Sequence, residues 1–429
     1  MDTSYNILLI GSGGREHAIA WKLNQSEYLG NLYTAPGNPG TDEFGINVNL
    51  DPSDFEQVAR FAAEQNIDVV VIGPEAPLVN GLTNYLESKN IAVFGPRKAA
   101  AMLEGSKEFA KEFMVKYNIP TADYAVFSSD EFDDALTFIQ TKEKYPIVLK
   151  ADGLAGGKGV FICNSEAEVV KRLEELKTSA SLSKAADRLL VEEFMEGEEA
   201  SVFVISDGHT SHIIHNAQDH KRIGEGDTGL NTGGMGAYSP APVLTEDILE
   251  QVKKQIIEPT ITGMQLEESD YQGILYVGLM ITDQGPKVVE YNCRFGDPEC
   301  QVILPSLEND LLDLIVAATE QRLDEVKIQL DDKHRCCVVL VSGGYPGSYE
   351  KEVLITGVDS IKEDAIVFHA GTKLMNGDLV TNGGRVLNVV ASGKTLKEAI
   401  DTAYKNVEKI HFDNCYYRKD IGHKGLDRL

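Results

Sequence analysis

The chain has 429 residues, a length that favours about two to four domains at roughly 100–200 residues each. Hydrophobic residues make up 42% and charged residues 25%, which is ordinary for a globular protein. The formal net charge of −27 argues against a nucleic-acid partner, because neutralising phosphates requires a clustered basic surface. No segment approaches the roughly 18 consecutive apolar residues of a membrane span, so we expect no membrane partner either.

The cysteines and the N-terminus indicate the cellular compartment. The six cysteines include no CxxC pair, and Cys336 and Cys337 are adjacent, which is the wrong spacing for a zinc knuckle. We therefore expect reduced, mostly buried thiols in a cytoplasmic protein. The opening sequence MDTSYNILLIG has no basic region, so we interpret it as a first strand and not as a signal peptide.

The first hundred residues alternate apolar strands with helices. We predict a first helix at about 16–23 and strands at 7–10, 31–34, 68–72 and 92–94. Apolar strands separated by helices indicate a parallel, doubly wound sheet. Glycine and proline are frequent in the turns after these strands, and ligands of such sheets bind at the carboxyl ends of the strands.

The pattern changes at about residue 107, where a predicted helix at 107–117 leads into strand-rich sequence. Residues 151–158 form a glycine-rich connection between two predicted strands of a hairpin. The polar, glycine-rich stretch at 216–240 is long enough to predict a functional loop. The other predicted elements are a helix at 309–320 and strands at 147–150, 159–163, 189–192, 200–205, 274–282 and 287–292.

The last hundred residues are predicted to form a separate α+β unit. Its strands are expected at 336–342, 366–370 and 385–391. Its final helix is expected to open at Thr395, with Glu398 completing a capping box.

The turn at 11–17 (GSGGREH) follows the first strand and opens a helix. Glycines in such a turn let backbone N–H groups approach an anion at the helix N-terminus. A dinucleotide-binding fingerprint requires a third glycine where Glu16 stands, which argues against a nicotinamide cofactor. Arg15 and His17 suit a phosphate or a small polar ligand better. A tight turn without any ligand is the alternative interpretation.

The loop that ends in Lys158 differs from a P-loop, because Gly159 and not Ser or Thr follows the lysine. It also lies between two strands, whereas a P-loop precedes a helix. A hairpin glycine loop can still cover a triphosphate with backbone donors and a lysine. Lys150 lies on the strand before it, so the two lysines form a candidate phosphate clamp. The alternative is a flexible surface hairpin.

Glu290 and Asn292 are two residues apart on a predicted strand, so both side chains project from one face. Hard oxygen ligands in this arrangement suit Mg²⁺ that bridges nucleotide phosphates. Arg294 follows them and offers a bidentate fork for a carboxylate or a phosphate. An exposed strand face followed by a turn is the alternative. The segment 192–195 indicates no more than an acidic turn by its own pattern.

Motifs along essentially the whole chain resemble the phosphoribosylamine–glycine ligase family of ATP-grasp enzymes. The matching stretches, in chain order, are 9–18, 73–78, 150–159, 218–222, 231–240, 292–299, 369–373, 382–385 and 418–422. The resemblance implies ligation of glycine to 5-phosphoribosylamine in de novo purine biosynthesis. ATP would be converted to ADP and phosphate through a glycyl phosphate intermediate. We expect a monomer whose partners are these small molecules alone.

The family fold implies three parts. Residues 1–106 would form an N-terminal α/β domain with a doubly wound parallel sheet. Residues 107–328 would form the ATP-grasp domain, with a mobile subdomain at about 121–194. Residues 329–429 would form a small α+β C-terminal domain.

The resemblance also implies which residues contact ATP and the metal ion. Arg294 and Lys150 would be the catalytic residues, and Glu290 and Asn292 would bind Mg²⁺ or Mn²⁺. The implied ATP contacts are Lys107, Lys150, Gly157, Lys158, Gly159, Glu192, Glu193, Phe194, Met195 and Glu199.

The two other substrates would be bound by residues from several motifs. The implied contacts to phosphoribosylamine are Gly13, Gly14, Arg15, Glu16, Asn38 and Glu75. The implied contacts near glycine and the reacting groups are Asp219, Lys221, Gly234, Met235, Arg294 and Asp297. One position departs from the wider superfamily, because Gly278 stands roughly where many ATP-grasp enzymes carry a third metal ligand.

Three other functions stay open at this point. An ATP-grasp ligase for a different acid and amine would be distinguished by substrate screening. A nicotinamide-dependent oxidoreductase is disfavoured by Glu16. A non-catalytic nucleotide-binding protein would bind ATP without glycine-dependent hydrolysis.

Overall fold

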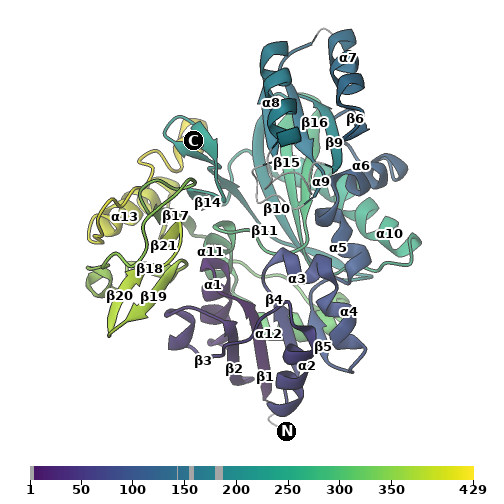
Figure 1. Cartoon of the computed structure of the whole chain (residues 1–429). Helices are drawn as coiled ribbons and strands as arrows, with labels where there is room; N and C mark the ends of the chain where they lie inside the picture. The colour runs from purple at the N-terminus through teal and green to yellow at the C-terminus, as the bar shows by residue number, and fades with distance from the viewer. Residues whose placement is uncertain (1–3, 143, 154–158, 179–186) are drawn as a thin grey trace.

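The computed structural model describes residues 4–142, 144–153, 159–178 and 187–429. Figure 1 shows the N-terminal sheet at the bottom, a small sheet with two helices at the top and the C-terminal strands on the left. None of the described helices is long and apolar enough to cross a membrane.

The N-terminal sheet has five parallel strands in the order β3-β2-β1-β4-β5, which confirms the doubly wound prediction. The four residues Ile7 to Ile10 of β1 are fully buried, because a parallel sheet of this kind is covered on both faces. In the sheet, β2 and β3 lie on one side of β1, and β4 and β5 lie on the other side. The strands are β1 (Tyr5–Gly11), β2 (Leu29–Pro36), β3 (Ile46–Asn47), β4 (Val69–Ile72) and β5 (Ala92–Phe94).

The reversal of strand order between β1 and β4 defines where this sheet can bind a ligand. In doubly wound sheets, the crevice lies at the carboxyl ends of the two strands that flank such a reversal. The turn after β1 and the segment Gly73-Pro74-Glu75 after β4 therefore come together. The helices of this part are α1 (Gly14–Leu23), α2 (Phe55–Glu64), α3 (Glu75–Asn80), α4 (Leu82–Glu87) and α5 (Lys98–Gly105).

A second, antiparallel sheet has four strands in the order β6-β9-β7-β8. It has its own core, in which Phe132 and Ile139 pack against Leu149 and Leu189. The strands are β6 (Tyr124–Ser128), β7 (Ile147–Ala151), β8 (Val160–Cys163) and β9 (Arg188–Glu193). The helices of this region are α6 (Lys107–Lys116), α7 (Phe132–Lys142) and α8 (Glu166–Thr178).

The third sheet has eight strands. It includes strands of the C-terminal region, because β14 pairs with β11 on one side and with β17 on the other. Sequence patterns locate strands but do not say which edges pair. The order is β16 (Gly285–Asn292), β15 (Gln272–Thr282), β10 (Glu198–Asp207), β11 (Ser211–Asp219), β14 (Gly236–Ser239), β17 (His334–Val341), β21 (Arg385–Gly393) and β18 (Ala365–His369).

The stretch at 216–240, predicted as one long loop, is mostly strand. It contains the end of β11, the hairpin of β12 (Arg222–Gly224) and β13 (Thr228–Asn231), and all of β14. The prediction was wrong because glycines and polar side chains weaken the alternating pattern of a strand without preventing backbone pairing.

The remaining elements complete the C-terminal half. Thr395 caps α13 (Leu396–Val407) by accepting from the Glu398 N–H, as predicted, but Glu398 accepts from the Lys394 N–H and so does not complete the capping box. It is not the final helix, however, because α14 (His423–Arg428) follows it. The others are α9 (Glu246–Val252), α10 (Glu258–Leu266), α11 (Glu299–Ile303), α12 (Leu311–Thr319), β19 (Thr372–Met375) and β20 (Asp378–Thr381).

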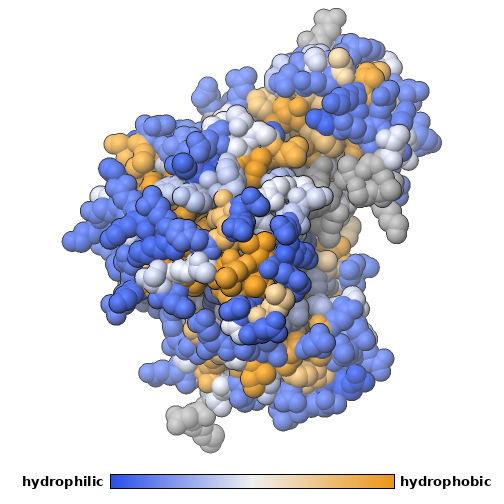
Figure 2. Space-filling model, turned by 60° about the vertical axis from the view of Figure 1, so that its left-hand side comes forward, coloured by the Kyte–Doolittle hydropathy of each residue, from blue (hydrophilic) through white to orange (hydrophobic). Residues whose placement is uncertain are grey.

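The face in Figure 2 is mostly hydrophilic, with smaller hydrophobic areas between the charged side chains. This agrees with a chain that carries 67 acidic and 40 basic residues, since most charged side chains stay in contact with water.

Candidate active site

The turn between β1 and α1 is braced by its own side chains. Glu16 accepts from the Gly13 N–H at 2.6 Å and from Arg15 Nε at 2.6 Å. Arg15 and Glu16 are 7% and 2% exposed, so both point into the protein. Sequence analysis predicted both as substrate contacts, and that role stays a prediction. Glu16 holds the backbone of Gly13 in place, and Arg15 bonds to Glu16.

His17, which the sequence suggested for phosphate binding, is instead a structural residue. Its Nδ1 accepts from the His369 N–H at 2.7 Å, and only 3% of the residue is exposed. Burial, reinforced by His369, lowers the pKa of His17 to about 3. A neutral imidazole that already accepts a backbone hydrogen bond has no positive charge to offer a phosphate.

Asn38 is also occupied within the protein. Its Nδ2 donates to Ser12 O at 2.8 Å and to His369 O at 3.0 Å, and its Oδ1 accepts from the Gly40 N–H. Asn38 therefore joins the glycine turn to the C-terminal strands. Its predicted contact to phosphoribosylamine is untested.

Arg294 is held by two carboxylates from the N-terminal domain. Its Nε lies 3.2 Å from Glu75 Oε2, and its Nη2 lies 2.9 Å from Glu104 Oε1. The same Nη2 donates to Asn292 Oδ1 at 3.2 Å. Glu104 also accepts from the Cys293 N–H at 2.7 Å. Sequence analysis did not select Glu104, because it lies in helix α5, far along the chain from the motif that it supports.

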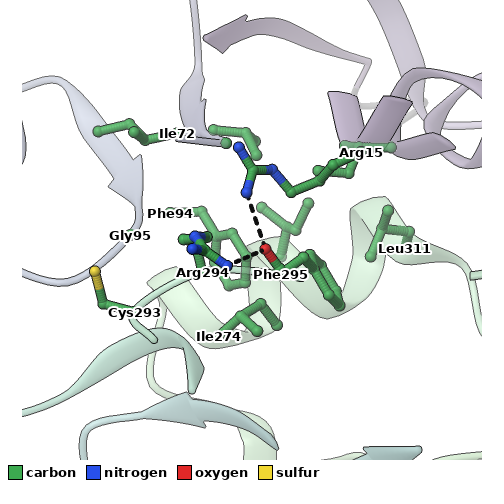
Figure 3. A pocket seen from close by; sticks show the side chains of 13 residues that line it. Arg15, Ile72, Phe94, Gly95, Ile274, Cys293, Arg294, Phe295 and Leu311 are labelled. Carbon is green, nitrogen blue, oxygen red and sulfur yellow. Dashed lines mark hydrogen bonds between the residues drawn. The ribbon is translucent and has the colours of Figure 1, made fainter. Parts of the chain in front are cut away.

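Arg15 and Arg294 converge on one backbone oxygen. Both donate to Phe295 O, at 3.0 and 3.2 Å, as the dashed lines in Figure 3 show. The small cavity beside them has a volume of about 20 Å³ and a mostly apolar lining that includes Phe94 and Ile274. It has room for about one water molecule and none for a substrate.

Glu290 and Asn292 lie on β16, as predicted, with Glu290 opposite Gly278 and Asn292 opposite Tyr276. Burial raises the pKa of Glu290, but the positive charges of Lys221, Lys150 and others outweigh it, and the net shift is downward. The carboxylate is therefore ionised at neutral pH. Gly278 has no side chain, so the position opposite Glu290 offers no third oxygen ligand.

Lys150 brings the four-stranded sheet against the strand that carries Glu290. Its Nζ donates to Val289 O at 3.2 Å and lies 3.0 Å from Glu192 Oε2. This contact brings the lysine-bearing strand against the strand of Glu290, while binding of a triphosphate between them stays a prediction. The side chain of Glu192 is 2% exposed, so it pairs with lysine inside the site.

Lys111 is a further lysine of this cluster, and sequence analysis did not select it. Its Nζ lies 3.2 Å from Glu192 Oε2 and donates to Thr121 Oγ1 and Ala122 O. Burial lowers the pKa of Lys111 to about 8, despite the opposing charge of Glu192. A signal was available, because Lys107 and Lys111 are four residues apart on one face of a helix.

Lys107 contacts the start of the glycine loop. Its Nζ donates to Asp152 O and Gly153 O, each at 3.1 Å. At the other end of the loop, the Gly159 carbonyl accepts from the Ala151 N–H at 2.8 Å. Gly157 and Lys158 lie outside the described residues, so their predicted contacts with ATP are untested.

The segment after β9 connects the two sheets. Glu193, Phe194 and Met195 are all half-buried, and Glu193 lies 3.7 Å from Lys287. A half-exposed apolar pair between two sheets is compatible with a flat aromatic ligand. The ATP contact predicted for these residues remains a proposal.

An acidic group surrounds Lys221 near the end of β11. Lys221 Nζ lies 3.0 Å from Glu199 and 3.7 Å from Glu290. Burial raises the pKa of Asp219 to about 7. Glu299, which the sequence did not single out, accepts from Tyr276 OH at 3.0 Å and is 4% exposed. One lysine therefore balances several carboxylates.

Met235 and Gly234 are both predicted to contact the substrates near the glycine site, but they can contribute different groups. Met235 is fully buried in the hydrophobic core, so only its backbone can meet a ligand. Gly234 has φ +114°, and an added Cβ would lie 2.5 Å from Pro298 Cδ. This close approach places the 231–235 segment directly against the loop that contains Asp297.

The fold and the site define the class of the protein. The profile of the phosphoribosylglycinamide synthetase ATP-grasp (A) domain matches residues 105–300, so this is an ATP-grasp protein. The N-domain and C-domain profiles of the same family match residues 5–104 and 335–424. The chain therefore belongs to the phosphoribosylglycinamide synthetase family.

Relatives match over the full length. A phosphoribosylamine–glycine ligase of Agrobacterium fabrum is 50% identical over 98% of this chain and 99% of its own. A bifunctional purine biosynthetic protein of Schizosaccharomyces pombe is 47% identical, over 98% of this chain and 54% of its own. The crystal structure of a phosphoribosylamine–glycine ligase from Thermotoga maritima has a TM-score of 0.82 at 34% identity, covering 97% of this chain and all of that one.

Proposed function

We propose that this protein ligates glycine to 5-phosphoribosylamine, with ATP converted to ADP and phosphate, as a step of purine biosynthesis. Full-length relatives at about 50% identity bear the name of this reaction. The observation that carries the proposal within the structure is the contact of Lys150 with the strand of Glu290, since it brings a cationic clamp against candidate metal ligands.

In the proposed first half-reaction, a glycine carboxylate oxygen attacks the γ-phosphorus of ATP, and the bond to the β–γ bridging oxygen breaks. Glycyl phosphate and ADP form. Charge spreads over the oxygens of the phosphoryl group in transit, so fixed cations there lower the barrier. Lys107 and Lys150 serve this role, and Arg294 orients the carboxylate through its guanidinium fork.

In the proposed second half-reaction, the amine of phosphoribosylamine attacks the acyl carbon. The C–O bond to phosphate breaks, phosphate leaves and the nitrogen loses a proton. Much of the acceleration comes from holding the three substrates together. Asp219 and Glu199 lie beside Lys221 in an acidic region that suits the ammonium group of glycine.

Glu290 and Asn292 fit a divalent cation, which would supply charge neutralisation at the ATP phosphates. The fit rests on an ionised carboxylate and an amide oxygen that project from one strand face and remain partly open to solvent. Mg²⁺ is the proposed ion, and Mn²⁺ shares the same oxygen chemistry.

A coupled ADP-release assay that omits each substrate in turn tests the function. We expect ADP and phosphate only with glycine and the amino sugar both present. AMP and pyrophosphate would instead indicate an adenylating enzyme. Release of ADP with a different acid or amine would support another ATP-grasp ligase.

The domain limits at 106 and 328, a monomeric state and a cytoplasmic location also remain proposals. Limited proteolysis tests the limits, with the first cuts expected near these positions. Light scattering of the purified protein tests the monomer.

A further inference from the structure

Two motifs that lie far apart in the chain meet in the structure. One is 218–222 (QDHKR), at the end of β11, and the other is 418–422 (RKDIG), close to the C-terminus. The Gly422 N–H donates to His220 Nε2 at 3.0 Å, across a separation of 202 residues. The first motif contains two residues of the candidate site, so the contact connects that site to the end of the chain.

Arg418 is fully buried, and all three nitrogens of its guanidinium have partners. Nε and Nη2 donate to the two carboxylate oxygens of Asp420, at 2.8 and 2.7 Å. Nη1 donates to Asp227 Oδ1 at 2.8 Å and to Arg222 O at 3.0 Å. The planar fork of arginine therefore joins both the turn and the first residue of the β12–β13 hairpin to the segment 418–424.

The turn of this hairpin has further contacts with the same segment. Lys424 Nζ lies 2.5 Å from Asp227 Oδ2, and the Gly226 N–H donates to Asp420 Oδ2 at 2.8 Å. The two basic side chains of the cluster thus balance its two carboxylates. Removing one partner of a buried charged cluster is costly, because it leaves another charge uncompensated.

His220 is held between the hairpin and the C-terminal segment. It is fully buried, and burial lowers its pKa to about 4, so the ring is neutral at neutral pH. Because Nε2 accepts from Gly422, the ring hydrogen is on Nδ1, which faces Asp227 Oδ1 at 3.7 Å. The ring therefore has a fixed orientation, and His220 lies between Asp219 and Lys221 in the chain.

The backbone on either side of Lys221 is fixed in the same way. His220 O accepts from the Met235 N–H at 2.8 Å. Lys221 O accepts from the Thr232 N–H at 2.8 Å. Together with the hydrogen bond from the arginine to the next carbonyl, three successive carbonyl oxygens have assigned donors. The Lys221 ammonium, which balances the carboxylates of the candidate site, extends from this fixed backbone.

We propose that the C-terminal segment 418–424 positions Asp219 and Lys221 for glycine binding, through Arg418 and the ring of His220. The inference rests on the proposed function, and it gives the end of the chain a part in the reaction without contact to a substrate. Arg418 is therefore a positioning residue. A shift of the Lys221 backbone would change how the acidic side chains around it are balanced, and with it the place for the ammonium group of glycine.

The variant Arg418→Lys keeps the positive charge and loses the planar fork, so it removes hydrogen bonds without leaving the aspartates uncompensated. We expect the KM for glycine to rise by about tenfold and the KM for ATP to change by less than about twofold, because the lysines that would bind ATP lie on other elements. Amide hydrogen exchange of residues 219–224 should become faster in the variant. This second measurement needs no catalysis.

Arg335→Lys is the matched control. Arg335 is also buried, and its Nη atoms donate to Asp331, Ser306 and Pro305 O, none of which belongs to the candidate site. Urea denaturation should show a loss of stability similar to that of Arg418→Lys. We expect both KM values and the hydrogen exchange of 219–224 to stay as in the wild type.

Asp227→Asn decides the matter by the same criteria if Arg418→Lys fails to fold. Asp227 has φ +55°, a conformation that asparagine also adopts, and its side chain is 30% exposed. A normal KM for glycine in the deciding variant, an equal rise in the KM for ATP, or the same rise in Arg335→Lys overturns the proposal. Failure of the ligase function appears separately, as the absence of glycine-dependent ADP release by the wild type.

Discussion

Arg294 and Glu104 form a buried ion pair, with Nη2 and Oε1 2.9 Å apart and the Glu104 side chain 7% exposed. Glu104 also accepts from the Cys293 N–H, so it fixes both the guanidinium and the backbone next to it. We expect Glu104 to be a positioning residue for Arg294.

The variant Glu104→Gln keeps the size of the side chain and removes the charge. We expect the KM for glycine to rise by about tenfold, because the guanidinium is held less firmly, with the KM for ATP little changed. Steady-state kinetics with each substrate varied measures both. A rise in the KM for ATP alone would contradict this role.

The variant Glu290→Ala removes the charged candidate metal ligand. We expect kcat to fall by about 10²–10³-fold while the fold survives, since loss of a fixed electrostatic stabiliser has effects of this size. Glu250→Ala, on an exposed helix face, is the control and should retain normal turnover. Near-normal rates in Glu290→Ala would remove the metal assignment.

The variant Lys111→Met tests the buried lysine that the sequence did not reveal. It removes the Nζ group that donates hydrogen bonds to Thr121 Oγ1 and Ala122 O in the folded protein. We expect the free energy of unfolding to fall by about 1–3 kcal/mol, the cost of unsatisfied buried groups. Urea denaturation measures it. Lys116→Met, on the exposed end of the same helix, should cause no measurable change.

The raised pKa of Asp219 predicts a pH dependence of stability. Burial raises this pKa from 3.8 to about 7 in the folded protein, so the folded state binds a proton that the unfolded state releases earlier. The contribution is fully present below pH 3.8 and is lost as the pH rises through 7. Asp219→Asn should abolish that loss. The measurement is the unfolding free energy of the wild type and of the variant from pH 4 to 8. The same pH dependence in both proteins would contradict the raised pKa of Asp219.

The sequence predicted the local elements and the motifs that identify the family. Ile7 to Ile10 read as a buried strand because four consecutive apolar residues suit a parallel sheet, and they form one. Glu290 and Asn292 were placed on one face by the two-residue period of a strand. The fold class and the family were accessible because these signals lie within short stretches of chain.

The sequence by itself determined which residues could bind phosphate, metal and carboxylate, since this depends on side-chain chemistry and local period. Only the tertiary structure decided which of them are free to act. Arg15 and His17 turn inward, while Glu104 and Lys111 join the site from helices far away in the chain. The pairing of β14 with β17 likewise brings Arg385 to within 3.5 Å of Asp297. Such contacts form between segments far apart in the chain, and burial and strand pairing, which create them, are properties of the whole fold.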